Sequence, residues 1–353
     1  MRMTRPYDMS KFRKEQNKKL KIKDGFFDPI TWIDTGNFAL NKMMSGDFFK
    51  GVPIGSVTTF AGEPASGKSY IVSGNIVKNA LESGVSVILL DTENAVKKTW
   101  ASALGVDTDN ENIIRWSKRT INQVAELISD FMKGYSEEYL TVPREEQPPV
   151  LLVIDSIGNL ETESGLKQFE EGDMKGDKGL FAKQLKALMK NATGAFDGFQ
   201  VGMVVTNHTY KNQNQYSDHE DVITGGGGII YMSDIVVLLN KSKLKLDDDG
   251  IKTKTTQGII SKLKCAKSRY AKPFEEVEVH IPYETGMDPY SGLFEMFEKI
   301  LKKDGNSYIY FSKEQNKEYK LTKKKMDNAF FDMLMKEWDD AIIISQPEIE
   351  TEH

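Results

Sequence analysis

Eight residues, Gly62-Glu63-Pro64-Ala65-Ser66-Gly67-Lys68-Ser69, constrain the fold of this 353-residue chain more than any other segment. The apolar run 57–61 before them predicts a buried strand, and residues 69–81 after them predict a helix. A strand, a glycine-containing loop and a helix in this order wrap phosphate groups, because backbone N–H groups and the helix N-terminus face the negative charge. We expect Lys68 to reach the β- and γ-phosphates and Ser69 to bind Mg²⁺. A chance match in a Gly/Ser loop is the alternative.

Short apolar runs alternate with longer amphipathic stretches from residue 55 onward, which is typical of a mainly parallel sheet with crossover helices. We therefore expect an α/β fold with helices flanking a central sheet. The predicted strands are 56–61, 85–91, 149–155, 199–206, 234–240, 258–266 and 274–282, and the predicted helices are 69–83, 95–104, 119–134, 180–192 and 324–344.

Three regions are expected along the chain. Residues 1–34 form an N-terminal arm whose basic part has helical character, and a solvated tail is the alternative. Residues 35–285 form the main core, and residues 286–353 form a small C-terminal region rich in lysine and aromatic side chains.

The composition excludes several classes of protein. No apolar run is long enough to span a bilayer, so we expect no membrane partner and a cytoplasmic location. The single cysteine, Cys265, cannot form an internal disulfide, and the four scattered histidines do not have the spacing of a zinc site. The net charge of −5 means that any contact with nucleic acid must come from local basic patches.

Two further apolar runs each end in carboxylates. Val150–Ile154 leads to Asp155, which we expect to hold Mg²⁺ through a water, with Ser156 beside it. Residues 87–90 lead to Asp91, Thr92 and Glu93, and a carboxylate beside the phosphate-loop strand can polarise the water that attacks the γ-phosphate. Glu93 is thus the candidate base. A turn aspartate after a buried strand and a solvated loop glutamate are the alternatives.

A series of short motifs recurs in a characteristic order. They are Thr35-Gly36, Ala39-Leu40-Asn41, the phosphate loop, Asp91-Thr92-Glu93, Leu104-Gly105-Val106-Asp107, Asp155-Ser156-Ile157-Gly158-Asn159-Leu160, Asn207-His208-Thr209-Tyr210, Gly225 to Gly228, Lys267-Ser268-Arg269 and Asp288-Pro289-Tyr290-Ser291-Gly292-Leu293. Each motif alone is unspecific. In this order and spacing they resemble the RecA/UvsX recombinase family, closest to the bacteriophage UvsX branch, over about residues 33–300.

The resemblance implies a RecA-like P-loop ATPase core that binds ATP and Mg²⁺. It makes Glu93 the catalytic carboxylate, sets Trp100 against adenine, and makes His208 the γ-phosphate sensor, where bacterial RecA has Gln. Lys267 and Arg269, two apart on a predicted strand, would reach the ATP of a neighbouring subunit. A buried helix tryptophan and an exposed strand face are the alternatives. The nucleotide-binding residues expected in full are Gly62, Glu63, Pro64, Ala65, Ser66, Gly67, Lys68, Ser69, Tyr70, Trp100 and Asp155.

Two long glycine-containing loops, 161–179 and 209–228, follow core strands and correspond to the DNA-binding loops of the resembling family. The expected DNA contacts are Lys175, Lys178, Tyr210, Lys211, Gly225 and Gly226. Acidic residues lie among them, so the two loops are not strongly basic. We expect DNA binding that is salt-sensitive and without sequence preference, with much of the site formed only when subunits line up. The glycine run is expected to act as a hinge, and a purely structural turn is the alternative.

The expected function is that of a DNA-dependent ATPase that forms helical filaments on single-stranded DNA and carries out homologous pairing and strand exchange with duplex DNA. A mediator protein and a single-strand-binding protein are the accessory partners that the resemblance implies. One alternative is a RecA-core ATPase with another role, such as a helicase-like motor or a recombination mediator. Another is a passive filament that binds ATP as a structural ligand.

Overall fold

The structure is a computed structural model that describes residues 8–20, 25–173, 179–211, 221–245 and 255–345. Its centre is a large sheet whose strands follow the order β11-β10-β9-β3-β7-β6-β4-β5, with β8 paired to the end of β7. The strands are β3 (Val57–Gly62), β4 (Ser86–Asp91), β5 (Ile113–Trp116), β6 (Val150–Asp155), β7 (Val201–Lys211), β8 (Asp221–Ile223), β9 (Ile235–Leu244), β10 (Gly258–Lys267) and β11 (Glu276–Pro282).

The six strands from β9 to β5 are parallel, and β10 and β11 extend the sheet in antiparallel fashion. Parallel strands need cover on both faces, and the side chains of β6 show how this is met. Leu151 and Val153 belong to one buried cluster, whereas Leu152 and Ile154 belong to another on the opposite face. The expected α/β fold with helices on both faces is therefore confirmed.

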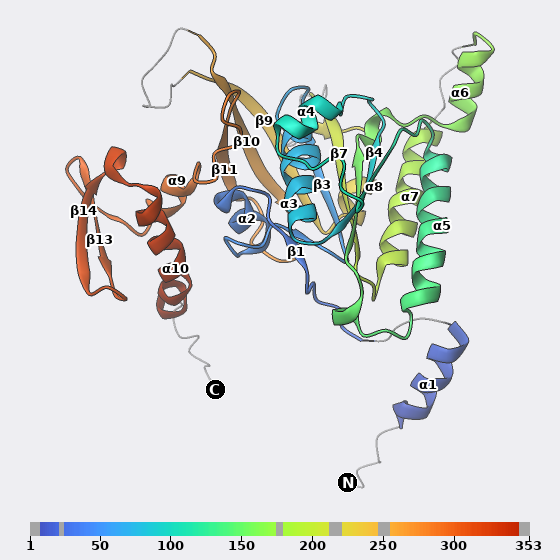
Figure 1. The fold of residues 1–353 in the computed structure, drawn as a ribbon, viewed down its shortest axis with the longest axis horizontal. Coiled ribbons are helices and arrows are strands. Elements are labelled where there is room, and N and C mark those ends of the chain that lie inside the picture. The colour runs from blue at the N-terminus through green and yellow to red at the C-terminus, as the bar shows by residue number, and fades with distance from the viewer. Residues whose placement is uncertain (1–7, 21–24, 174–178, 212–220, 246–254, 346–353) are drawn as a thin grey trace, which may run out of the picture.

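Helices α5 (Ile121–Tyr139), α7 (Leu180–Phe196) and α8 (Gly228–Met232) supply the second cluster. The first cluster includes α2 (Phe38–Ser45), the π-helix η1 (Tyr70–Ile76), α3 (Val77–Glu82) and Ala101 of α4 (Lys98–Ala103). In Figure 1, α5 and α7 stand side by side at one end of the sheet, and α2 and α3 lie toward the other. The helix predicted at 69–83 is thus a π-helix followed by a short α-helix.

The seven predicted strands are all present, with shifted ends. The largest shift is in β7, which continues to Lys211 because β8 pairs with its last three residues. The prediction missed β5, whose four residues are largely exposed at the sheet edge, and the two-residue strands β1 (Trp32–Ile33) and β2 (Val52–Pro53). Three short 3₁₀ segments, η2 (Arg144–Glu146), η3 (Ile157–Asn159) and η4 (Lys323–Lys325), were also unforeseen.

The C-terminal region contains more than the predicted helix. Strands β12 (Lys302–Asp304), β13 (Ser307–Ser312) and β14 (Lys317–Thr322) form a separate antiparallel sheet, and α9 (Leu293–Phe297) and α10 (Asn328–Ser345) pack with it. Phe297 stacks on Phe48 at a centroid distance of 5.5 Å and meets Trp338 edge-on at 5.3 Å. This region therefore shares one continuous apolar cluster with the core.

One asparagine joins the beginning of the core to its end. Asn37 caps α2 by accepting a hydrogen bond from the Leu40 N–H at 2.8 Å. Its Nδ2 donates to the carbonyl oxygens of Asp288 and Ser291, at 2.9 and 3.0 Å. Two motifs that lie 251 or more residues apart in the chain thus meet at a single buried amide.

Helix α1 (Met9–Leu20) confirms the helical character expected for the basic N-terminal segment. Figure 1 shows α1 lying away from the central sheet, and Met9 and Phe12 are exposed. Among the described residues, no helix is long and apolar enough to cross a bilayer.

Candidate nucleotide site

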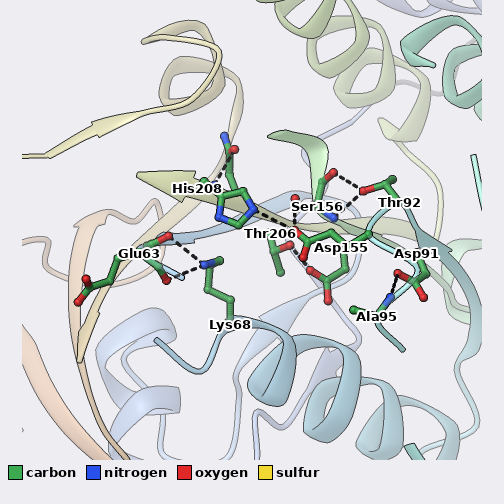
Figure 2. A network of polar contacts seen from close by, with 12 residues as sticks. Glu63, Lys68, Asp91, Thr92, Ala95, Asp155, Ser156, Thr206 and His208 are labelled. Carbon is green, nitrogen blue, oxygen red and sulfur yellow. Dashed lines mark hydrogen bonds and ion pairs between the residues drawn. The ribbon is translucent and has the colours of Figure 1, made fainter. Parts of the chain in front are cut away.

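The phosphate loop begins where β3 ends. Gly62 lies so close to β9 that a Cβ there would come within 2.4 Å of the Leu239 carbonyl oxygen, and Gly67 has a φ of +96°. Lys68 Nζ donates to the carbonyl oxygens of Gly62 and Glu63, both at 2.9 Å. Figure 2 shows Lys68 reaching back across the loop toward Glu63.

Two residues that the sequence did not single out also hold the loop carbonyls. Lys241 of β9 donates to the Pro64 carbonyl, and Ser261 Oγ of β10 donates to the Ser66 carbonyl at 2.7 Å. Together with Lys68, these bonds bind the carbonyl groups of four loop residues. The role of Lys241 could not be predicted from the sequence, because it depends on the pairing of β9 with β3. Leu239 pairs with Gly62, so Lys241, two residues later on β9, lies beyond the end of β3 and beside the phosphate loop.

Lys68 is buried, and this desolvation lowers the pKa of its ammonium group from the ordinary value. The negative charges of Glu93 and Asp155 act in the opposite direction, and the nearby Lys241 adds to the lowering. Lys68 is well prepared to bind an anion, because a negatively charged phosphate oxygen would attract its ammonium group more strongly than the neutral carbonyl oxygens of Gly62 and Glu63.

Asp155 lies at the end of β6 and is buried beside the loop. Its Oδ2 accepts a hydrogen bond from Ser73 Oγ at 2.6 Å, and its Oδ1 accepts one from Thr206 Oγ1. Ser69 is the N-cap residue of the π-helix η1, and its side chain makes no capping hydrogen bond. The donor set therefore consists of hard oxygens, and the Ser66 hydroxyl is buried without a partner among the described residues, which fits an Mg²⁺ nucleotide.

Glu93 lies beyond the end of β4, beside β7. Its Oε1 accepts from Ser156 Oγ at 2.8 Å and contacts His208 Nε2 at 2.9 Å. Thr92 binds Ser156 twice, through its hydroxyl to the carbonyl at 2.7 Å and by accepting from the N–H at 2.9 Å. The two residues that sequence analysis expected to be base and sensor therefore touch each other directly.

Asp91 stabilises the turn after β4, a role that the sequence alone did not predict. It is fully buried, accepts from the N–H groups of Ala95 and Val96 at 3.1 and 2.9 Å, and pairs with Arg115 of β5 at 2.5 Å. These bonds fix the turn that carries Glu93, and Asn94 in that turn has a φ of +53°.

Trp100 of α4 is half-buried and meets Tyr70 edge-on, with ring centroids 6.4 Å apart. Gly286 lies against the same tyrosine, since a Cβ on it would approach the Tyr70 hydroxyl to 2.8 Å. Trp100 is thus near the start of the helix that follows the phosphate loop, and its contact with adenine remains a prediction.

Lys267 and Arg269 lie at the other end of the sheet. The expectation that they share one strand face is wrong, because β10 ends at Lys267 and Arg269 lies in the following turn. Lys267 Nζ donates to the carbonyls of Ile230, Tyr231 and Ser233, at 3.0, 3.0 and 2.5 Å. Arg269 pairs with Asp234 at 2.9 Å, and Asp234 in turn accepts from the N–H of Val57, the first residue of β3.

Val57 and Gly62 are five residue steps apart along β3, which is roughly 17 Å of extended strand. Arg269 is therefore too far from the phosphate loop of its own chain to touch a nucleotide bound there, and Lys267, which pairs in register with Val236 near the same end, faces α8 instead.

The two expected long loops contain regular structure. Residues 161–179 include α6 (Glu163–Glu170), which Thr162 caps by accepting from the Gly165 N–H at 3.0 Å. Residues 209–228 include the end of β7 and all of β8, and the glycine run precedes helix α8 rather than a strand. Among the described residues, the two predicted loops thus contain a helix and a strand pair, because the Thr162 cap and the pairing of β8 with β7 satisfy these backbone groups locally.

Of the expected DNA contacts, Tyr210 is exposed on β7 and the Lys211 backbone pairs with Asp221. Gly225 and Gly226 have φ values of +86° and +79°. Lys175 and Lys178 lie outside the described residues.

Comparison with known proteins adds a family match. Residues 10–288 match the family model of the RecA N-terminal domain. The "Recombination and repair protein" of Enterobacteria phage T4 is 27% identical over 276 residues, which cover 77% of this chain and 64% of that protein. "Protein RecA" of Bacteroides thetaiotaomicron is 24% identical over 296 residues, covering 82% and 81% of the two chains. "Protein RecA" of Wolbachia sp. subsp. Drosophila simulans is 25% identical over 340 residues, covering 93% and 88%.

Proposed function

This chain belongs to the RecA family, and from that premise we propose that it is an ATP-dependent DNA recombinase. It forms filaments on single-stranded DNA and catalyses homologous pairing and strand exchange in recombination, repair and recombination-dependent replication. One observation carries the proposal. Lys68, Asp155, Glu93 and His208 lie on or just after the four neighbouring strands β3, β6, β4 and β7, and they gather at the carboxyl end of these parallel strands.

The phosphate loop binds the triphosphate through its backbone N–H groups, and Lys68 exchanges its two carbonyl partners for the β- and γ-phosphates. Asp155 and Ser69 hold Mg²⁺. The metal would supply positive charge that neutralises the negative charge developing during phosphoryl transfer. Glu93 orients the attacking water and takes its proton.

The contact between Glu93 and His208 supports a link from ATP to DNA. The His208 N–H donates to Asn207 Oδ1 at 2.8 Å, and Asn207 Nδ2 donates to the Thr224 carbonyl at 2.8 Å. The Thr224 N–H returns a bond to the His208 carbonyl at 2.9 Å. A γ-phosphate that attracts the imidazole would release Glu93 and, through Asn207 and Thr224, shift the glycine run that follows.

Lys267 and Arg269 act on the ATP of a neighbouring subunit. Both residues lie at the amino end of the parallel strands, far from the phosphate loop of their own chain. This location supports the proposal, because only a second copy of the chain could bring a phosphate loop to them. Turnover would then require assembly, as in other active sites completed by a basic residue in trans. The exposed helix α1 suits the proposed role of residues 1–34 as an arm that contacts a neighbour.

DNA is held by the two segments that follow β6 and β7, through Tyr210, Lys211, Gly225, Gly226 and the residues Lys175 and Lys178. Residues 35–285 form the ATPase core, and the protein acts in the cytoplasm, which is that of the host cell if a phage encodes it, with a mediator and a single-strand-binding protein.

The test is the steady-state ATPase rate with and without single-stranded DNA, followed by a strand-exchange assay between homologous duplex and single strands. We expect a large stimulation by DNA that rises cooperatively with protein concentration, and homology-dependent exchange. Stimulation without exchange would favour a motor or mediator with the same core. Hydrolysis that is indifferent to DNA would contradict the recombinase proposal.

A further inference from the structure

The carboxylate of Asp155 is held from two sides by hydroxyl groups. Ser73 Oγ donates to one oxygen at 2.6 Å, and Thr206 Oγ1 donates to the other. Ser73 comes from the π-helix after the phosphate loop, and Thr206 comes from β7. All three side chains are buried, so water does not compete for these bonds.

A threonine on a neighbouring strand shows that a buried threonine hydroxyl in this sheet does not always have a hydrogen-bond partner. Thr58 lies on β3, is as fully buried as Thr206, and its hydroxyl has no partner among the described residues. Thr58 and Val204 pair in register, so Thr58 and Thr206 lie two positions apart on adjacent strands. A threonine hydroxyl in this sheet can thus remain unpaired, whereas the one on β7 is aimed at Asp155.

Ser73 is four residues after Ser69, so the two serines lie about one turn apart on the same helical segment. The helix that offers Ser69 to the metal therefore also carries the group that orients Asp155. An ionised carboxylate has about four lone-pair positions, and two hydroxyl donors leave the others available.

Resting on the proposed ATPase function, we propose that Ser73 and Thr206 are positioning residues that fix the Asp155 carboxylate for Mg²⁺. Neither touches the nucleotide or the reacting atoms. Their effect is on the metal, because groups that bind a ligand side chain from behind fix its orientation and tune its affinity. They should set the Mg²⁺ concentration at which the protein binds its nucleotide.

The experiment measures binding of a non-hydrolysable ATP analogue to the full chain by equilibrium dialysis, first with EDTA and then across a Mg²⁺ titration. We expect Ser73→Ala and Thr206→Val each to raise the Mg²⁺ concentration for half-maximal binding by about 10- to 100-fold. Affinity in EDTA should not change, since the loop and Lys68 are untouched. Thr206→Ser keeps the hydroxyl and should behave as wild type.

Thr58→Val is the matched control, because it removes a buried strand hydroxyl that has no hydrogen-bond partner among the described residues. An unchanged Mg²⁺ requirement in both Ser73→Ala and Thr206→Val would overturn the inference. Equal loss of affinity with and without Mg²⁺ would overturn it as well, since that pattern marks general damage to the site. Failure of the wild-type chain to bind the analogue at all would instead remove the proposed ATPase function.

Discussion

The two ends of the central sheet carry the same kinds of charged group but use them differently. At the carboxyl end of the parallel strands, Lys68, Asp155 and Glu93 bond to neighbours that surround one loop. At the amino end, Lys267 and Arg269 bond to the end of α8 and to Asp234. The first end gathers the groups of the proposed nucleotide site around the phosphate loop, whereas the second carries two basic residues far from the phosphate loop of its own chain. Under the proposed function, this difference means that the two ends of one chain would contribute to two different sites, each completed by a neighbouring subunit.

Removing the basic pair at the amino end should have the largest effect. We expect Lys267→Ala with Arg269→Ala to lower DNA-stimulated turnover by about 10³- to 10⁵-fold, as for other basic residues that complete a site in trans. Affinity of the dispersed subunit for ATP should not change. Lys264→Ala on the same strand, where Lys264 pairs with Glu276, is the control.

Mixing this variant with Glu93→Gln sharpens the comparison. In a mixed filament, some interfaces join a subunit with an intact Glu93 to a neighbour with intact Lys267 and Arg269. ATP bound at these interfaces should be hydrolysed, so the mixture should recover turnover. Two inactive proteins that stay inactive when mixed would contradict the assignment of the two ends to different sites.

Glu93→Gln alone should lower turnover by about 10²- to 10⁴-fold, because the variant keeps its hydrogen bonds but cannot accept a proton. ATP binding, measured by dialysis, should be retained. Glu82→Gln changes an exposed carboxylate on α3 and serves as the control. Undiminished turnover would remove Glu93 from the role of base.

Cys265 reports on opening of the amino end. Burial raises the pKa of its thiol from 9.0 to about 11, so the reactive thiolate should be roughly 100-fold scarcer near neutral pH than in an exposed cysteine. Alkylation by iodoacetamide should be slow at neutral pH, should accelerate as the pH approaches 11, and should become fast in denaturant. Rapid labelling of the native protein at neutral pH would show that β10 separates from its neighbours.

His208→Ala should uncouple DNA from hydrolysis. With the link from Glu93 to Asn207 and Thr224 broken, stimulation by single-stranded DNA should fall by about 5- to 150-fold, a typical range for coupling between sites. Basal turnover in the absence of DNA should change less. His280→Ala on β11 is the control, and an equal loss of basal and stimulated rates would argue for a direct chemical role instead.

Trp100→Ala should have the smallest effect, confined to the carboxyl end. Loss of one aromatic contact with the base should weaken ATP affinity by about 0.5–1.5 kcal/mol, or about 2- to 12-fold. Inorganic tripolyphosphate should bind unchanged, and Trp116→Ala on the edge strand β5 is the control. Equal weakening of both ligands would indicate disturbance of the loop through Tyr70.

The sequence predicted the fold well because its strands are short apolar runs whose order matches a parallel sheet. It also identified the residues that follow those strands, since Asp155 and Glu93 are adjacent in sequence to the runs that position them. It could not predict contacts that depend on strand order, such as Lys241 on Pro64, Arg115 on Asp91 or Ser73 on Asp155. Polar residues on η1, β5 and β9 have no local pattern that tells them from surface residues.

Prediction of the connecting segments was weaker for a related reason. Glycine and charge within 161–179 and 209–228 suggested loops, but the hydroxyl cap of Thr162 and the pairing of Thr209 with Ile223 were enough to form α6 and β8. The C-terminal sheet was missed because β12 and β14 carry lysines and all their residues are exposed or only partly buried, which hides the apolar pattern of a strand.

The amide of Asn37 has a consequence for synthesis of the chain. Its carbonyl partners follow it by 251 and 254 residues, and a ribosome adding about 5–20 residues per second needs on the order of ten to fifty seconds to supply them. During that interval α2 and its buried neighbours lack their final cover. The region around α2 is therefore completed late in synthesis, when residues 288–291 become available. A chain truncated before residue 288 should leave the apolar surface around α2 exposed, where chaperones can bind it.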